Sequence, residues 1–235
     1  MKRKTVVYTA IFGKYDELPA NLFTCDDVDY ICFSDHEFDS DLWKVILVDP
    51  IYNDSTRNSR KYKALPHRYL ADYDYSIWVD GNMCMISDYR ELINGSLFRT
   101  YDHMQCFDKR NCIYHEADMI LQLGQENMKK SPDRGILNWK DNPYIIQEQM
   151  DKYLAIGYPY DNGLAETSVV IRMHNDPRCV KLNEDWWTEM KYGSKRDQLS
   201  LNFVAWHNDI DIDYLPGDVR NNRYFQMISG HKGKR

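Results

Sequence analysis

The sequence lacks the features of membrane-spanning proteins, of proteins with structural zinc sites and of disulfide-rich proteins. No apolar run approaches the ~18 to 20 residues that cross a bilayer. The opening stretch MKRKTVVYTAIFGKYDEL has no uninterrupted secretory core, because Lys14, Asp16 and Glu17 break it. The six cysteines are scattered without a CxxC pair, which favours reduced thiols over a zinc site or a disulfide framework. We therefore expect a cytoplasmic protein without a transmembrane segment.

An excess of positive charge is also missing. Lysine and arginine number 30 against 36 aspartates and glutamates, and the formal charge of −6 disfavours a general nucleic-acid binder. No internal repeat, low-complexity block or Pro/Ser-rich linker divides the 235 residues, so we expect a single domain over 1–235. The 18 tyrosines suit stacking on bases or sugar rings, with a place in the hydrophobic core as the alternative.

Short apolar runs alternate with helical segments in the first half of the chain. TVVYTAIF, DYICFSD, WKVILVDP and SIWV have the composition of strands. DSTRNSRKYKALPHRYL, which lies between two of them, has helical spacing that places Arg60 and Lys63 on one side. This alternation predicts an α/β fold with a Rossmann-like, mostly parallel central sheet flanked by helices. We expect the later helical segments, CIYHEADMILQLGQ and NPYIIQEQMDKYLAIG, to cover that sheet.

Polar ligands follow the buried run SIWV at the point where the strand ends. Asp80 and Asn82 straddle a glycine there, at the edge where open α/β sheets bind ligands. Their oxygens suit Mg²⁺ or Mn²⁺, and a simple Asx-type turn is the alternative. Arg60 and Lys63 can neutralise a diphosphate beside the same edge, or they can form an ordinary solvated helix face.

Two later segments carry further candidates. Asp197 and Gln198 open the predicted helix of RDQLSLNFVAW, where a plain helix-terminus charge interaction is the alternative. The tail SGHKGKR offers the His231 imidazole as a metal ligand and Lys232 and Lys234 as phosphate partners. Composition alone describes that tail as a frayed terminus.

Taken together, a series of stretches resembles a hexosyltransferase-like family, once catalogued as a domain of unknown function, from plant mucilage and cell-wall proteins and from bacteria. The resemblance extends over most of the chain and rests on the order of YTAIFGKYDEL, DYICFSD, SRKYKALPHRYLADYDYSIWVDGN, RNCIYHEAD, IIQEQMDKYLAIGYP, GLAETSVVIRMHN, WWTEM and RDQLSLNFVAW. That family is in turn similar to the glycogenin-type retaining branch of the GT-A glycosyltransferases.

The resemblance implies a GT-A-like fold and a role for each polar motif. DGN resembles the Asp-x-Asp motif that binds Mn²⁺ and the donor diphosphate, although Asn82 replaces the second aspartate. RDQLSLN resembles the motif beside the donor sugar. HKGK resembles a late segment that closes over the phosphates, although it is shorter here. Retention of anomeric configuration is implied by the resemblance alone.

We therefore expect a glycosyltransferase that moves a hexose from a nucleotide sugar, with UDP as the expected nucleotide, to a glycan or glycolipid hydroxyl. Mn²⁺ or Mg²⁺ is the expected cofactor. About 1–95 is expected to bind the nucleotide, and about 96–235 the sugar and acceptor. The expected site comprises the metal ligands Asp80, Asn82 and His231, the catalytic residues Asp197, Gln198 and Glu166, and the donor-binding residues Thr9, Tyr15, Asp35, Arg60, Lys63, Lys232 and Lys234.

Two other functions remain open on the sequence. One is hydrolysis of a lipid amide, which has been discussed for a plant member of the resembling family, although the chain has no HExxH zinc motif. The other is a non-catalytic carbohydrate-binding module, which the aromatic content favours. The sequence does not specify the sugar, the acceptor or the oligomeric state.

Overall fold

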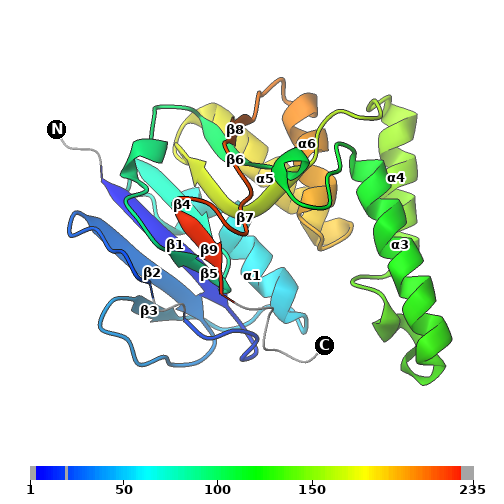
Figure 1. Ribbon diagram of the computed structural model, residues 1–235, viewed down its shortest axis with the longest axis horizontal. Coiled ribbons are helices and arrows are strands. Elements are labelled where there is room, and N and C mark those ends of the chain that lie inside the picture. The colour runs from blue at the N-terminus through cyan, green and yellow to red at the C-terminus, as the bar shows by residue number, and fades with distance from the viewer. Residues whose placement is uncertain (1–3, 19–20, 229–235) are drawn as a thin grey trace.

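The computed structural model describes residues 4–18 and 21–228, and these form a single α/β domain around a seven-stranded sheet (Figure 1). The strand order is β3-β2-β1-β4-β7-β6-β8. Its strands are β1 (Thr5–Ile11), β2 (Val28–Ser34), β3 (Lys44–Leu47), β4 (Tyr75–Val79), β6 (Phe98–Asp102), β7 (Ala165–Arg172) and β8 (Asp213–Leu215). Among these strands, β7 runs antiparallel to its neighbours and the rest share one direction. The prediction of a mostly parallel sheet is confirmed.

The register of the sheet brings the ends of distant segments to one edge. β1 pairs in parallel with both β2 and β4, so their carboxyl ends lie together. β7 runs the other way, and its first residue, Ala165, pairs with Asp102 at the end of β6. The Asp80 amide donates to the Ser168 carbonyl oxygen at 2.8 Å. The end of β4 and the beginning of β7 therefore meet at the same edge.

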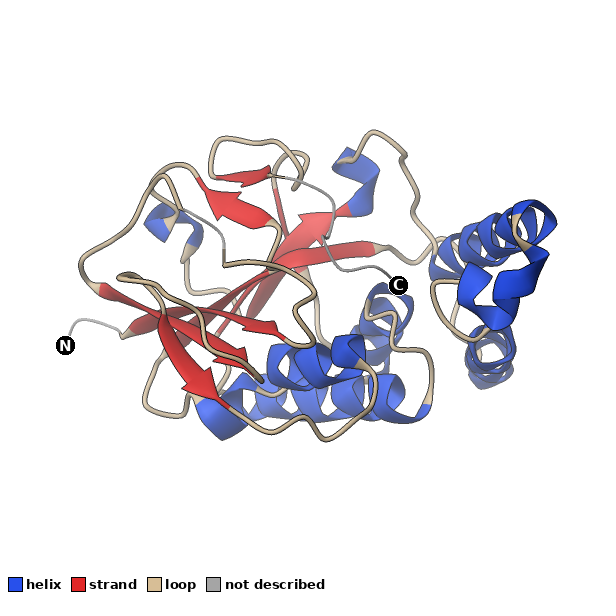
Figure 2. Ribbon diagram, turned by 90° about the horizontal axis from the view of Figure 1, so that it is seen from below, coloured by secondary structure: helices blue, strands red, loops and turns tan. Residues whose placement is uncertain are grey.

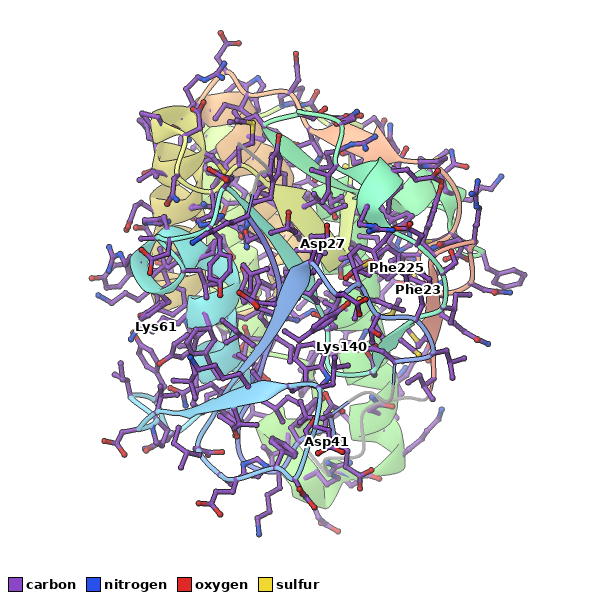
Figure 3. The ribbon with its side chains drawn as sticks, turned by 90° about the vertical axis from the view of Figure 1, so that its left-hand side faces the viewer. Phe23, Asp27, Asp41, Lys61, Lys140 and Phe225 are labelled. Atoms are coloured by element: carbon purple, nitrogen blue, oxygen red, sulfur yellow. The ribbon has the colours of Figure 1, made fainter. Side chains whose placement is uncertain are left out.

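Helices cover one face of the sheet, and a second, smaller sheet with its loops covers the other (Figure 2). The helices on the first face are α1 (Ser55–Ala64), α2 (Pro66–Tyr69), α5 (Pro177–Tyr192) and α6 (Gln198–His207). On the second face, β5 (Met83–Met85) pairs with β9 (Phe225–Met227), and short 3₁₀ turns lie at Arg90–Leu92 and His103–Gln105. Phe23 and Phe225, which lie close together in Figure 3, belong to the hydrophobic core on this side.

Two long helices lie beside the sheet instead of over it. They are α3 (Ile113–Lys130) and α4 (Pro143–Ile156), joined through the 3₁₀ segment η3 (Pro132–Asn138) (Figure 1). The expectation that these helices cover the sheet is wrong, because α3 packs against α6 and α4. α6 is buried on every side over 198–205, so it can pack on the sheet and on this helix pair at once. The stacked rings of Tyr153 and Phe203 join α4 to α6.

Within the residues that the structure describes, none of the helices combines the length and the apolar character needed to cross a membrane.

Candidate functional site

A cavity of about 510 Å³ opens at the carboxyl edge of the sheet. Its described lining comes from the end of β1, the loop at 15–16, the start of α1, Asp80 with Gly81, the connection at 136–142, and Lys195 with Arg196. Ligands bind at this edge in open α/β sheets, where the ends of several strands and helices converge. The cavity is therefore the candidate functional site.

Helix α1 carries the cationic side of the cavity. Asp54 caps it, because its carboxylate accepts the Arg57 amide at 3.0 Å, and Pro66 stands where the helix ends. Arg60 and Lys63 are three residues apart and therefore share one side of the helix. The predicted helix and the predicted placement of its two cations are confirmed.

Two cations and two carboxylates form a compact cluster beneath the cavity. Lys63 Nζ lies 2.5 Å from Asp197 Oδ2 and 3.4 Å from Asp80 Oδ1. The Arg60 guanidinium lies 3.3 Å from Asp197 Oδ1 and 3.5 Å from Asp80 Oδ1. Arg60 and Asp80 line the cavity, whereas the Lys63 and Asp197 side chains are 0% and 2% exposed. Since the formal charges within this cluster balance, it can be buried without a net charge.

Burial and charge act against each other on the pKa of Asp197. Burial alone would raise the pKa of this carboxyl, but Arg60, Lys63 and Arg196 outweigh it and hold the pKa below its ordinary value. Burial and the nearby Arg60 lower the pKa of Lys63, while Asp197 and Asp80 oppose that shift. We therefore describe Asp197 as the ionised partner that holds the two cations in place.

A buried arginine fixes the backbone of Lys63. Arg172 of β7 is 0% exposed, and its guanidinium donates to the Lys63 carbonyl oxygen and to the Tyr8 hydroxyl. Arg172 also donates to Asn183 Oδ1 at 2.9 Å, and the Tyr8 hydroxyl donates to the Lys63 carbonyl oxygen at 3.0 Å. Sequence reasoning missed this contact. The available signal was a cation inside the apolar run SVVIR, where a buried charge requires partners.

Asp80 is a predicted metal ligand that lines the cavity. Trp78 Nε1 donates to Asp80 Oδ1 at 2.7 Å and orients the group. Mg²⁺ is often held by one or two carboxylates, with substrate phosphates and water completing its shell. Because Arg60 and Lys63 approach Asp80 Oδ1 at 3.5 and 3.4 Å, a cation at Asp80 stays a prediction.

Of the other two predicted metal ligands, the structure describes Asn82. Asn82 is 8% exposed and lies outside the described lining of the cavity, and its backbone oxygen accepts from the Ile228 amide at 3.0 Å. His231, Lys232 and Lys234 lie outside the described residues.

Of the three residues predicted to contact the nucleotide, one lines the cavity and two do not. Tyr15 lines the cavity. Thr9 is 0% exposed inside β1, and its hydroxyl has no hydrogen-bond partner among the described residues. Asp35 accepts from the Gly13 amide at 3.0 and 3.1 Å and contacts His36 Nδ1 at 2.7 Å. Asp35 therefore shapes the turn after β1, and Thr9 and Asp35 both lie outside the described cavity lining.

Glu166 and Gln198 form a second polar pair at the same edge of the sheet. Gln198 Nε2 donates to Glu166 Oε2 at 3.0 Å, and Ser168 Oγ donates to Glu166 Oε1 at 2.9 Å. Burial raises the pKa of Glu166, with the Ser168 hydrogen bond and the His103 and Arg220 charges opposing it. The structure thus brings two predicted catalytic residues into direct contact.

A group of possible metal ligands surrounds the same glutamate. Ligand atoms of His103, Cys106 and Glu166 lie within 4.8 Å of one another. The Arg110 guanidinium donates to His103 Nε2 at 3.0 Å, and Arg220 approaches Glu166 Oε2 at 4.0 Å. Two guanidinium groups at these positions would repel a cation, so we interpret the group as part of a charged network and not as a metal site.

Sequence reasoning also missed part of the cavity lining. Lys195 and Arg196 lie just before α6, and Arg196 donates to Gln198 Oε1 at 3.2 Å. The connection at 136–142 comes from the distant α3–α4 pair. The sequence could have indicated Arg196, because it directly precedes the predicted Asp197. It could not have indicated the connection at 136–142, because only folding brings that segment to the edge of the sheet.

Comparison with known proteins identifies the family of this domain. The model of the TOD1/MUCI70, glycosyltransferase-like domain matches residues 34–215. The chain belongs to this family. The Arabidopsis thaliana protein "Probable hexosyltransferase MUCI70" is a relative with 24% identity over 225 residues, covering 86% of this chain. The alignment spans 37% of that relative's length. The family resemblance predicted from the sequence is confirmed.

Solved glycosyltransferase structures also resemble the TOD1/MUCI70 domain described here. One is the WbbM bifunctional glycosyltransferase in its apo form, with 10% identity and a TM-score of 0.44 over 92% of this chain and 39% of that one. Another is the mannosyltransferase Ktr4p from S. cerevisiae, with 11% identity and a TM-score of 0.43 over 86% of this chain and 65% of that one.

Proposed function

We propose that this domain transfers a hexose from a nucleotide sugar, with UDP as the expected nucleotide, to a glycan or glycolipid hydroxyl. The observation that carries the proposal is the buried cluster of Arg60, Lys63, Asp80 and Asp197, which opens onto a cavity in a glycosyltransferase-like domain. Within this neutral cluster, Arg60 lines the cavity and offers its guanidinium to the leaving diphosphate. Retention at the anomeric carbon is part of the proposal through the resemblance to glycogenin-type enzymes.

The proposed chemistry breaks the bond between the anomeric carbon and the diphosphate oxygen. Negative charge then develops on the leaving diphosphate, and Arg60 at the cavity wall stabilises it with support from Lys63. Mn²⁺ or Mg²⁺ held by Asp80 would neutralise further charge on the same phosphates. Tyr15, which lines the cavity from the β1 side, would contact the nucleotide.

The acceptor hydroxyl loses its proton as its oxygen bonds to the anomeric carbon. We assign that proton to Glu166, whose pKa is raised by burial and whose side chain lies outside the described cavity lining. Gln198 orients this carboxylate through its 3.0 Å hydrogen bond. Asp197 is 1% exposed, so we assign it a positioning role through Lys63 and Arg60 in place of the direct contact with the sugar expected from the sequence.

A thermal-shift panel tests the donor and the metal separately. UDP, GDP and their hexose conjugates are added with and without Mn²⁺, and a ligand at 100 times its Kd should stabilise the fold by about 2.7 kcal/mol. Asp80→Asn keeps the Trp78 hydrogen-bond acceptor and should lose the part of the shift that depends on Mn²⁺. Asp88→Asn, whose side chain is 46% exposed outside the cavity, is the matched control.

Each part of the proposal has its own contrary result. A panel without any shift for uridine or guanosine nucleotides would rule out the donor. A Mn²⁺-dependent shift that persists in Asp80→Asn would show that the metal binds elsewhere.

A further inference from the structure

The cavity lining contains both charged and exposed apolar side chains. Arg60, Asp80 and Arg196 are among the charged residues. The α3–α4 connection contributes Ile136 and Leu137, which are 50% and 62% exposed, followed by Trp139 and the polar residues 140–142. Neighbouring aliphatic side chains at this exposure are normal on a surface, but these two face the same space as the charged cluster. We call Ile136 and Leu137 the apolar wall.

The backbone that presents the apolar wall is fixed by buried polar contacts. Asn138 is 6% exposed, and its side-chain amide donates to the carbonyl oxygens of Ser131 at 2.9 Å and Gly135 at 3.0 Å. Asn127 donates to the Asn138 carbonyl oxygen at 3.2 Å. These bonds hold the turn of η3 in one shape. The exposure of Ile136 and Leu137 is therefore built into the turn.

The next residue anchors the connection to α3. Trp139 Nε1 donates to the Leu121 carbonyl oxygen at 3.2 Å, and its ring fills the space left by the missing side chain of Gly124. Trp139 also lines the cavity. The apolar wall thus continues as an indole surface that is attached firmly to the helix pair.

A ligand that fills this cavity must be polar at one end and apolar at the other. The sugar and diphosphate of the donor suit the charged residues, but they would leave the apolar wall exposed to water. The proposed function places the nucleotide base at Tyr15, beside β1. The acceptor is therefore the substrate part left to cover it.

We infer that the acceptor is a glycoside with an apolar aglycone, such as an alkyl, acyl or isoprenoid chain, and that Ile136 and Leu137 bind that chain. This inference rests on the proposed function, since it assigns the second substrate of the same cavity. The chain of the acceptor would then run along the wall, with its sugar toward the charged residues of the same cavity.

Binding of two matched glycosides tests the inference without a turnover assay. Methyl β-D-glucopyranoside and n-octyl β-D-glucopyranoside, the latter below its micelle concentration, are titrated by saturation-transfer NMR and calorimetry. The protein should bind the octyl glycoside at least tenfold more tightly. The double variant Ile136→Ser/Leu137→Ser should lose that preference, and it should fold normally because both side chains are largely exposed. Leu154→Ser in α4, which is 42% exposed outside the cavity, should keep it.

The contrary results separate this inference from the proposed function. Equal binding of the two glycosides by the unmodified protein, or an octyl preference that survives in the double variant, would overturn the apolar wall as an acceptor site. The UDP thermal shift is measured on the same samples. A normal UDP shift without octyl preference leaves glycosyl transfer standing and removes only the wall. An octyl preference without any UDP shift supports the wall and contradicts transfer from UDP-sugars.

Discussion

Asp197 determines whether Arg60 and Lys63 can remain buried next to each other. We predict that Asp197→Asn lowers the free energy of unfolding by about 3 kcal/mol, because removing one partner of a buried ion pair leaves charge without compensation. The Thr167 hydroxyl, 2.7 Å from Asp197 Oδ2, can still bond the amide oxygen, so the shape of the site is nearly preserved. Urea denaturation followed by circular dichroism at pH 7 measures the difference.

A surface pair provides the control at the same scale. Asp185 contacts Lys181 at 2.7 Å within α5, and its side chain is 40% exposed. Asp185→Asn should cost less than about 1 kcal/mol, because solvent screens exposed pairs. If both variants lose the same small amount, the cluster around Asp197 contributes no more than an ordinary surface contact and its positioning role is wrong.

At the scale of the element, the α3–α4 pair depends on one small residue. Gly124 is buried in α3, and a Cβ built there would lie 1.9 Å from Trp139 Cδ1. Alanine normally stabilises a helix interior by about 1 kcal/mol over glycine. Here we predict the opposite sign, a loss of about 1 to 3 kcal/mol, because the rigid indole must move. Thermal or urea denaturation measures it.

If the Trp139 indole moves, the neighbouring Ile136 and Leu137 should move as well. Gly124→Ala should therefore weaken octyl glycoside binding while leaving the UDP thermal shift unchanged. Gln122→Ala, at an exposed position of the same helix, should change neither property. A stabilised Gly124→Ala protein with normal octyl binding would show that Trp139 can be accommodated elsewhere.

At the scale of the whole molecule, local patterns predicted the frame of the site. Apolar runs that end on polar residues located β1, β2 and β4 and placed Asp80 at the carboxyl edge. Helical spacing placed Arg60 and Lys63 on one side of α1. These features depend on residues within a few positions of one another, which is the range that periodicity reports.

The rest of the site depends on contacts between distant parts of the chain. Lys63 bonds to Asp197, from which it is separated by 134 positions in the sequence. Arg172 donates to the Lys63 carbonyl oxygen over a sequence separation of 109. The apolar wall comes to the cavity only because α6 is buried all round and carries α3 and α4 beside the sheet. A sequence pattern cannot report such pairings, because each residue type there also suits an ordinary surface or core position.

A buried histidine links two distant segments and makes the stability of the whole domain sensitive to acid. His174 is 0% exposed, and its Nε2 donates to the Leu70 carbonyl oxygen at 2.9 Å. Burial lowers the pKa of His174 to about 4, with Arg172 and His67 acting in the same direction and the Leu70 bond and Asp74 opposing them. The unfolded chain binds this proton near pH 6.5, so it takes up the proton first as the pH falls.

Stability from His174 is therefore complete above about pH 6.5 and is lost as the pH falls toward 4, by at most about 3 kcal/mol. His174→Gln keeps an N–H donor for the Leu70 carbonyl oxygen but removes the titration. Its free energy of unfolding, measured by urea denaturation from pH 7.5 to 4.5, should therefore decline less steeply than that of the unmodified protein. His115→Gln, at a side chain 55% exposed, should retain the original slope. Parallel profiles for all three proteins would show that His174 takes up its proton without unfolding the domain.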